Sequence, residues 1–245
     1  MAANWKMYKT AQQTTAFFDK FTPLIQGVSA CDAVIFPTSL CIPAAAQAAA
    51  GTNVQIGGQN LYWGREGAFT GEVSADMLVS AGATCVLIGH SERRQYFHES
   101  DADVLKKAQA ALEAGLKPIV CVGERLEERK GNKTAEVLVK QFAGGLAGLT
   151  EEQFAKIVVA YEPVWAIGTG LTATPEIAAE AHGLIRAEAA VRFGEDAAQQ
   201  LRILYGGSVK PDNVEGLLKE SEIDGALVGG ASLDPESFSK IVKAG

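Results

Sequence analysis

One stretch of the chain combines a carboxylate with the backbone features of a movable flap. Residues Ile157–Ala160 are β-branched or apolar and predict a buried strand, whose end delivers Glu162. Pro163 prevents the strand from continuing, and Gly168 and Gly170 can adopt backbone angles that are closed to other residues. A carboxylate that a flap can seal from water is suited to proton abstraction. A solvated glutamate in a surface loop is the alternative that this stretch alone leaves open.

Two further strand-like runs end in polar side chains suited to the same chemistry. The first ends in Ala3-Asn4-Trp5-Lys6, and the two-residue alternation of a strand places Asn4 and Lys6 on one face. An amide and a lysine there can stabilise an oxyanion or bind a phosphate. The other run leads into Gly89-His90-Ser91-Glu92-Arg93-Arg94, which contains one of only three histidines. A surface lysine and a structural histidine are the alternatives, although the charged turn after His90 favours a functional role.

Glycine pairs follow the last two strand-like runs. Tyr205-Gly206-Gly207-Ser208 follows one run, and Gly229-Gly230-Ala231-Ser232 follows the other. Glycines let backbone N–H groups approach an anion closely, and a helix N-terminus adds a favourable dipole. The alternative is that each pair only terminates its strand. Because both pairs follow the strands whose loops bind phosphate in barrels, they predict a phosphate site.

The predicted elements bring these residues to one end of a barrel. Strand-like runs alternate with helical patterns over the whole chain, which indicates a parallel sheet. Eight such units in 245 residues fit a single-domain (β/α)8 barrel over residues 1–245, with active residues at the carboxyl ends of the strands. An open, doubly wound sheet is the alternative, but it predicts fewer strands and a glycine fingerprint that is absent. The predicted strands are Ala2–Trp5, Ala33–Phe36, Val54–Gly57, Cys85–Ile88, Pro118–Val122, Ile157–Tyr161, Ile203–Tyr205 and Ala226–Val228.

Helical patterns and one long loop fill the spaces between these strands. A helix is predicted over Asp101–Ala114, and another over Glu176–Phe193 after the capping pair Thr174-Pro175. The connection from Gln59 to Val73 is too long for an ordinary turn and carries three aromatic residues. Such a loop suits insertion into a partner, and packing on its own subunit is the alternative.

Composition excludes several other classes of protein. The chain is 47% hydrophobic and 21% charged, and its net charge of −7 argues against nucleic acid or an anionic membrane as a partner. The longest apolar-rich stretch, around Ala44–Ala50, is far short of the roughly 20 residues that span a bilayer. No signal peptide heads the chain, which favours a reducing, cytoplasmic location. We predict buried free thiols for the four cysteines, Cys31, Cys41, Cys85 and Cys121.

The sequence offers no motif for a metal or a nucleotide cofactor. His90, His98 and His182 lack the spacing of metal ligands, and there is no G-x-x-x-x-G-K-[ST] loop or G-x-S-x-G elbow. We therefore expect neither a metal nor a cofactor.

Taken together, these motifs closely resemble the triosephosphate isomerase family, over essentially the whole chain and in the family's order. The lid-like stretch and the His-Ser-Glu-Arg-Arg stretch are highly specific, whereas the glycine pairs are much less so. The resemblance is carried by Asn4-Trp5-Lys6, Gly89-His90-Ser91-Glu92-Arg93-Arg94, the stretch from Ala160 to Gly170, Tyr205-Gly206-Gly207-Ser208 and Gly229-Gly230.

The resemblance implies a TIM barrel that interconverts dihydroxyacetone phosphate and D-glyceraldehyde 3-phosphate through an enediolate, without cofactor or metal. By this likeness Glu162 is the base that moves a proton between two carbons, and His90 is the electrophile at the oxygens. Lys6 neutralises charge on the enediolate and the phosphate, and Asn4 helps to fix the oxygens. The phosphate contacts implied by the family are Gly168, Ser208, Gly229 and Gly230.

The family likeness also carries a lid and a dimer. Pro163–Gly170 would be the lid, held shut by Tyr205 and Ser208. The long loop after the third strand would enter a second subunit of a homodimer, with Thr70 near its tip. Family members carry several more residues before the Asn-x-Lys motif, so we expect a very short first strand here.

Two other functions remain as alternatives. The first is another phosphosugar barrel, but the metal ligands of an epimerase and a suitably placed Schiff-base lysine of an aldolase are both missing. The second is a catalytically silent barrel that binds phosphorylated ligands, against which the intact set of Asn4, Lys6, His90 and Glu162 argues.

Overall fold

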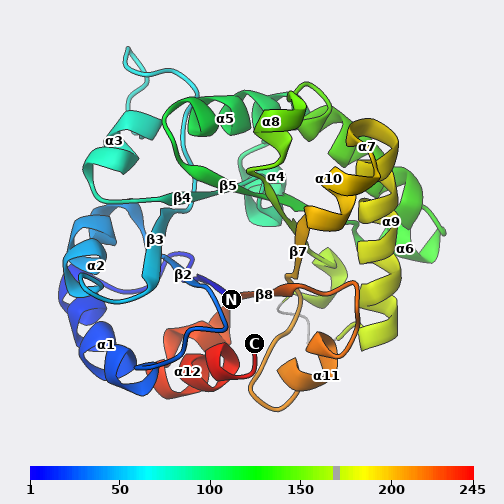
Figure 1. Cartoon of the computed structure of the whole chain (residues 1–245). Coiled ribbons are helices and arrows are strands. Elements are labelled where there is room, and N and C mark those ends of the chain that lie inside the picture. The colour runs from blue at the N-terminus through cyan, green and yellow to red at the C-terminus, as the bar shows by residue number, and fades with distance from the viewer. Residues whose placement is uncertain (168–171) are drawn as a thin grey trace.

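The eight strands of the chain close into a barrel. The computed structural model describes residues 1–167 and 172–245. Within them each strand pairs in parallel with the next in sequence, and β8 pairs back with β1 (Figure 1). The predicted (β/α)8 barrel is therefore confirmed. Its strands are β1 (Ala2–Asn4), β2 (Ala33–Phe36), β3 (Val54–Gly58), β4 (Cys85–Ile88), β5 (Lys117–Val122), β6 (Val158–Tyr161), β7 (Arg202–Tyr205) and β8 (Gly225–Val228).

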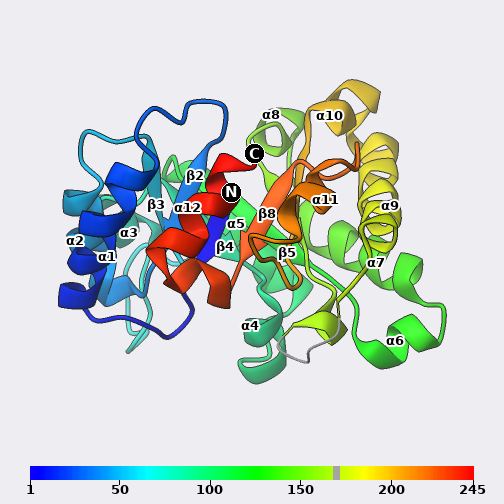
Figure 2. The same cartoon turned by 90° about the horizontal axis from the view of Figure 1, so that it is seen from below.

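Helices surround the barrel, as Figures 1 and 2 show from two directions. The α-helices are α1 (Ala11–Leu24), α2 (Ile42–Ala48), α3 (Ala75–Ser80), α4 (Ser91–Tyr96), α5 (Asp101–Glu113), α6 (Leu126–Lys130), α7 (Thr134–Leu146), α8 (Glu151–Phe154), α9 (Pro175–Phe193), α10 (Glu195–Gln200), α11 (Val214–Leu218) and α12 (Pro235–Lys243). Short 3₁₀-helices are η1 (Ser39–Cys41), η2 (Val164–Ala166) and η3 (Gly230–Leu233).

The predicted helix starts are confirmed where the sequence carries a cap. Thr174 accepts a hydrogen bond from the Ile177 N–H, and Pro175 opens α9, where the missing N–H of proline costs nothing. Ser100 and Asp103 form a capping box at the start of α5, which begins at the predicted Asp101. Local side-chain chemistry is thus enough to fix these boundaries.

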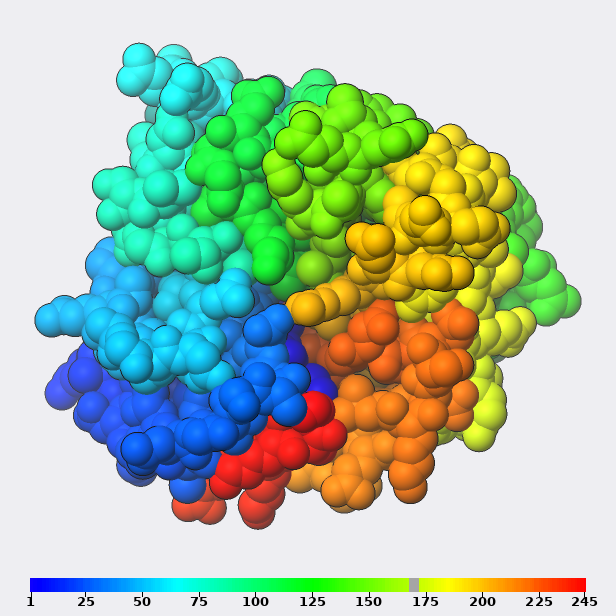
Figure 3. Space-filling model, viewed as in Figure 1, coloured from blue at the N-terminus to red at the C-terminus, as the bar shows by residue number. Residues whose placement is uncertain are grey.

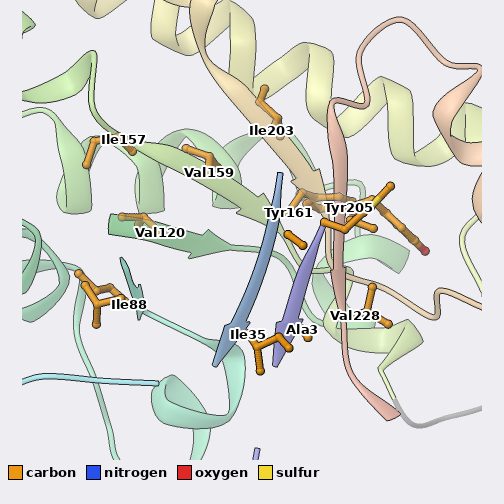
Figure 4. Close-up of a cluster of buried hydrophobic side chains, with 14 of the residues drawn as sticks. Ala3, Ile35, Ile88, Val120, Ile157, Val159, Tyr161, Ile203, Tyr205 and Val228 are labelled. Carbon is orange, nitrogen blue, oxygen red and sulfur yellow. The ribbon is translucent and has the colours of Figure 1, made fainter. Parts of the chain in front are cut away.

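Alternation along the strands separates two cores. One core lies inside the barrel and includes Ala2, Leu87, Ala160 and Leu204. The other lies between the barrel and the helices, and Figure 4 shows its strand residues, among them Ala3 and Ile35. Neighbouring residues of one strand, such as Ala2 and Ala3, belong to different cores because successive side chains point to opposite faces.

The same alternation carries polar residues to the carboxyl end of the barrel interior. Ala2 is followed two residues later by Asn4, and Ala160 by Glu162. Leu204 and Leu227 are followed in the same way by Gly206 and Gly229. The candidate site residues and the glycines beside them therefore lie together at the carboxyl end of the barrel interior.

The first strand is short, as predicted: β1 has three residues and ends at Asn4, one residue before the predicted end at Trp5. The chain continues the pairing on both sides of it, since Met1 O accepts from Val34 N at 2.9 Å and Trp5 N donates to Phe36 O at 3.1 Å. Trp5 is fully buried, and its indole N–H donates to the Ser232 carbonyl at 3.2 Å. The short strand β1 is thus held by backbone hydrogen bonds to β2 and by the Trp5 side chain, which binds the segment after β8.

The remaining sequence expectations concern cysteines and membrane helices. All four cysteines are free and buried, as predicted. Burial raises the pKa of the Cys121 thiol well above its usual value, so Cys121 is packed rather than reactive. In the part of the chain that the structure describes, none of the helices has both the length and the apolar character needed to cross a bilayer.

Candidate active site

The predicted site residues meet at one cavity of about 690 Å³ at the carboxyl end of the barrel. In Figure 2 this is the end marked by α4, which starts just after β4. Gly168, a predicted phosphate contact, lies outside the described residues. All the other predicted contacts line the cavity: Asn4, Lys6, His90, Glu162, Ser208, Gly229 and Gly230.

Glu162 follows β6 directly and is held in a narrow slot. Its backbone N–H donates to Val122 O at 2.8 Å. A Cβ atom on Gly123 would lie 1.8 Å from Glu162 O, and one on Gly206 would lie 3.0 Å from Glu162 Cγ. Both flanking positions therefore require glycine. The side chain is 2% exposed, and Ser91 N donates to its Oε2 at 2.9 Å.

His90 is aimed at Glu162 by the turn between β4 and α4. Gly89 has a φ of +73°, which breaks the strand and turns the next side chain into the cavity. The N–H of Glu92 donates to His90 Nδ1 at 3.2 Å, and Nε2 lies 2.9 Å from Glu162 Oε1. Because Nδ1 accepts a hydrogen bond, we assign the ring proton to Nε2, where it points at the carboxylate.

The two buried groups shift each other's protonation. Burial alone would raise the pKa of the Glu162 carboxyl group, but the His90 ring and the Ser91 N–H more than offset this and lower the pKa. Burial alone would lower the pKa of His90, but the Glu162 carboxylate more than offsets this and raises it. Glu162 is therefore ionised at neutral pH, the state that a general base requires.

Lys6 reaches the cavity through an uncommon backbone conformation. Its φ is +50°, in the left-handed region that side chains other than glycine rarely adopt. Two hydrogen bonds hold it there: the Lys6 N–H donates to Asn4 Oδ1 at 3.0 Å, and Gln59 Nε2 donates to Lys6 O at 2.8 Å. Such a strained residue persists only where its surroundings fix it, and strain of this kind concentrates at functional sites.

The lysine ammonium group lies between a carboxylate and the glycine pair of β8. Lys6 Nζ is 2.6 Å from Glu92 Oε1, and both side chains are partly exposed. A Cβ atom on Gly229 would lie 3.7 Å from Lys6 Cε, so the pair Gly229-Gly230 borders the lysine stem. Ser208 lines the same cavity. A cation beside backbone N–H groups is an arrangement that can bind a phosphate.

The first part of the predicted lid is anchored below the cavity. Glu124, which is fully buried, accepts hydrogen bonds at Oε1 from Tyr161 OH at 3.0 Å and from Trp165 Nε1 at 2.9 Å. Burial raises the pKa of Tyr205, one of the predicted lid contacts, to about 12. The predicted lid, Pro163–Gly170, continues into residues 168–171, which lie outside the described part of the chain.

Sequence reasoning missed three residues that hold the site together. Ser91 binds the base, Glu92 binds the lysine, and Gln59 holds the lysine backbone. Ser91 and Glu92 lie inside the motif around His90, and their place next to it was a usable signal. No local pattern pointed to Gln59, since its role depends on contacts with two other strand ends.

The described residues contain no cluster of three or more histidine, cysteine, aspartate or glutamate side chains able to hold a metal ion. The groups that meet in the cavity are a carboxylate, an imidazole, an ammonium and backbone N–H groups near glycine. Such a set can remove a proton from carbon while it stabilises negative charge on oxygen and binds a phosphate.

Comparisons with known proteins agree with this arrangement. A family model for triosephosphate isomerase matches residues 1–245. A triosephosphate isomerase from Solibacter usitatus is 61% identical over 242 residues, which cover 99% of this chain and 97% of that protein. One from Fusobacterium nucleatum is 51% identical, covering 100% of this chain and 98% of that protein. The crystal structure of triosephosphate isomerase from Bartonella henselae superposes with a TM-score of 0.89 at 42% identity, covering 100% and 97% of the two chains.

Proposed function

We propose that Glu162, His90 and Lys6 carry out the reaction of this chain, which belongs to the triosephosphate isomerase family. The chain is an isomerase that interconverts dihydroxyacetone phosphate and D-glyceraldehyde 3-phosphate by proton transfer through an enediolate. The comparisons do not support a catalytically silent barrel. One observation carries the assignment of residues: the Glu162 carboxylate, His90 Nε2 and Lys6 share one cavity, with the first two 2.9 Å apart.

Glu162 acts as the base in this proposal. Its carboxylate removes a proton from the carbon next to the carbonyl of dihydroxyacetone phosphate, which leaves an enediolate. The same group returns the proton to the neighbouring carbon, while the proton of the hydroxyl on the first carbon passes to the oxygen of the second by way of His90, which gives the aldehyde. To reach the substrate, the carboxylate has to leave the hydrogen bonds that it makes with Ser91 and His90.

That movement decides the state of His90. Burial, the largest influence on the pKa of His90, lowers it, and the Glu162 carboxylate raises it more than Glu92 does, so departure of the Glu162 carboxylate shifts the pKa of His90 downward. The Glu92 N–H continues to occupy Nδ1. His90 then meets the substrate as a neutral ring with its proton on Nε2, ready to donate to the carbonyl or hydroxyl oxygen.

Lys6 supplies positive charge, and the glycine pairs supply contacts to the phosphate. The ammonium group of Lys6 offsets negative charge on the enediolate, while Ser208, Gly229 and Gly230 bind the phosphate together with Gly168. Asn4 holds the Lys6 backbone and faces the substrate oxygens. Binding energy from the phosphate then closes the lid and keeps water from the enediolate.

Orders of magnitude show why several groups are needed. A general base contributes roughly 10²–10⁴-fold, and one well-placed donor at an oxyanion about 10²–10³-fold. Enzymes reach about 10⁶-fold or far more, so Glu162 alone is insufficient. The base, the imidazole and the ammonium group together account for such a rate.

Replacement of the base tests the assignment. We expect Glu162→Gln to cut kcat by several orders of magnitude, because the amide cannot accept the carbon-bound proton. Binding of a phosphorylated enediolate analogue should be largely kept, since the phosphate contacts are unchanged. The control is Glu152→Gln on α8, whose side chain is 87% exposed. A coupled assay measures turnover, and a kcat within tenfold of the parent in Glu162→Gln would contradict the proposal.

We also propose that the enzyme is a homodimer joined through the loop of residues 59–73. The loop projects from the rim beside α3 (Figures 1 and 3), and residues 65–72 are all exposed. At its base Tyr62 stacks on Trp63 and packs on Phe69, with centroids 4.2 and 4.3 Å apart. The aromatic residues thus pack on one another within the loop, and the tip with Thr70 is exposed.

A cavity on the same side gives the loop a place to enter. This cavity, of about 450 Å³, is lined by Lys6 and His90 and by Phe97, which is 65% exposed. Met7, on its rim, is 91% exposed. Exposed apolar side chains around a cavity suit a second copy of the chain. We further propose that residues 1–245 form one domain and that the enzyme works in the cytoplasm, where its buried free thiols stay reduced.

A further inference from the structure

A glutamine outside the reaction cavity is bound to the backbone that surrounds the base. Gln141 lies in α7 and is half-buried. Its Oε1 accepts from Gly123 N at 2.8 Å, and its Nε2 donates to Gly123 O at 3.0 Å. The side-chain amide therefore satisfies both polar groups of one peptide residue, as a neighbouring strand would do.

Gly123 is the residue against which the base is seated. A Cβ atom there would lie 1.8 Å from Glu162 O and 2.7 Å from Glu162 C, so the two backbones are in direct contact. On one side of Gly123, Val122 O accepts from Glu162 N at 2.8 Å. On the other, Glu124 O accepts from Val164 N at 3.1 Å. Residues 122–124 thus form a cradle for the chain on both sides of Glu162.

Because the central residue of this cradle is glycine, its backbone requires support from another element of the fold. Glycine is the residue with the greatest backbone freedom, and β5 ends one residue before it, at Val122. The two hydrogen bonds from Gln141 fix the peptide groups on each side of Gly123. Without them, the peptide groups beside Gly123 are held only through the bonds of Val122 O and Glu124 O to Glu162 N and Val164 N, and the Glu162 carbonyl that rests on Gly123 loses part of its support.

We propose that Gln141 is a positioning residue for Glu162 and acts through Gly123. It does not line the cavity that holds the catalytic groups, but a neighbouring one of about 510 Å³ that shares Glu162 with it. Its effect is on the geometry of proton transfer, in which a displacement of about 1 Å can cost about 10²-fold in rate. The inference rests on the proposed role of Glu162 as the base.

Two substitutions test the clamp in the full-length enzyme. Gln141→Met keeps the length of the side chain and removes both hydrogen bonds. Gln141→Glu keeps the shape, removes the donor and turns a carboxylate toward Gly123 O. We expect kcat to fall at least tenfold in both, with KM within threefold of the parent, because the phosphate contacts lie elsewhere. The primary deuterium isotope effect on the substrate carbon should rise, since proton transfer becomes slower.

The control is Gln109→Met in α5, because Gln109 Nε2 also donates to a backbone carbonyl, that of Gly148, at 3.4 Å. It should leave kcat and the isotope effect unchanged. Active sites are counted by titration with a phosphorylated enediolate analogue, so that only folded enzyme enters kcat. A kcat within twofold of the parent in both Gln141 variants overturns the proposal. Failure of both to fold also overturns it, since Gln141 would then serve the fold and not the base.

Glu162→Gln, measured in parallel, separates this proposal from the one on which it rests. If Glu162→Gln keeps its turnover, the role of Glu162 as the base is wrong, whatever Gln141 does. If Glu162→Gln loses turnover and the Gln141 variants keep theirs, only the clamp is wrong.

Discussion

At the scale of single residues, Lys6 is held by contacts to both its backbone and its side chain. Its backbone is held at a φ of +50° by Asn4 and Gln59, and its side chain pairs with Glu92. A replacement that only fills space cannot restore the charge that faces the enediolate and the phosphate. We therefore expect the lysine to contribute to both binding and turnover.

We predict that Lys6→Ala lowers kcat/KM by about 10²–10³-fold or more, since one donor at a developing oxyanion contributes about that much. KM should rise as well, because the phosphate loses its cation. Lys156→Ala is the control: its pair with Glu152 is exposed on both sides and contributes little. Steady-state kinetics with dihydroxyacetone phosphate check this, and unchanged constants in Lys6→Ala would remove Lys6 from the site.

The sequence was sufficient to predict the site residues whose own motif indicates their chemistry. His90 and Glu162 each follow a buried strand, and strand ends of a barrel meet at one edge. Gln59 and Gln141 could not be predicted in this way. Both are ordinary polar residues, and their roles depend on which backbone groups lie next to them after folding.

At the scale of elements, the predicted strands match the structure within a residue at each end. Each strand is buried on both faces, in the inner and in the outer core, so it appears in the sequence as a run of β-branched and apolar residues. Such runs are easily distinguished from the mixed polar and apolar patterns of the helices. The long loop was predicted only in part. Its length was readable, but the stacking of Tyr62 between Trp63 and Phe69 depends on tertiary contacts.

Helix α9 carries a buried imidazole that ties stability to pH. His182 is fully buried, with its Nδ1 3.0 Å from Glu222 O, and its ring packs edge-on to Tyr161. Burial lowers the pKa of His182 from 6.5 to about 4. Between these values the unfolded chain binds a proton and the folded chain does not, so the free energy of unfolding falls as the pH falls.

We predict that proton uptake by His182 on unfolding lowers the free energy of unfolding by about 2 kcal/mol as the pH falls from 7 to 5. His182→Phe should be less stable at pH 7 because Glu222 O loses the nearer of its two donors, the other being Arg186 Nη2 at 3.5 Å, but its stability should fall less toward pH 5. Urea titrations at one protein concentration check the difference. The control is Val191→Ala at an exposed position of the same helix, which removes no titratable group and should keep the parent's pH dependence. Equal slopes for the parent and His182→Phe would show that His182 does not titrate in this range.

At the scale of the whole molecule, the open question is how one barrel meets another. The loop itself lines part of the cavity, at Gly71, Glu72 and Val73, and the cavity reaches Lys6 and His90. Gln59, the first residue of the loop, holds the carbonyl of Lys6. A second copy seated there would stiffen the catalytic lysine as well as cover apolar surface.

A dilution series of sedimentation velocity runs should therefore show a dimer, with activity falling as the dimer dissociates. Thr70→Arg should weaken the dimer at least tenfold, because it brings a much longer side chain into the cavity of about 450 Å³ that we propose Thr70 enters. Val191→Arg is the control: Val191 is 81% exposed on α9, across the barrel from the loop (Figure 1). It introduces the same charge and should leave the dimer intact. A stable parent monomer with full activity would contradict both the dimer and its support of Lys6. Full activity in a monomeric Thr70→Arg would contradict only the support of Lys6.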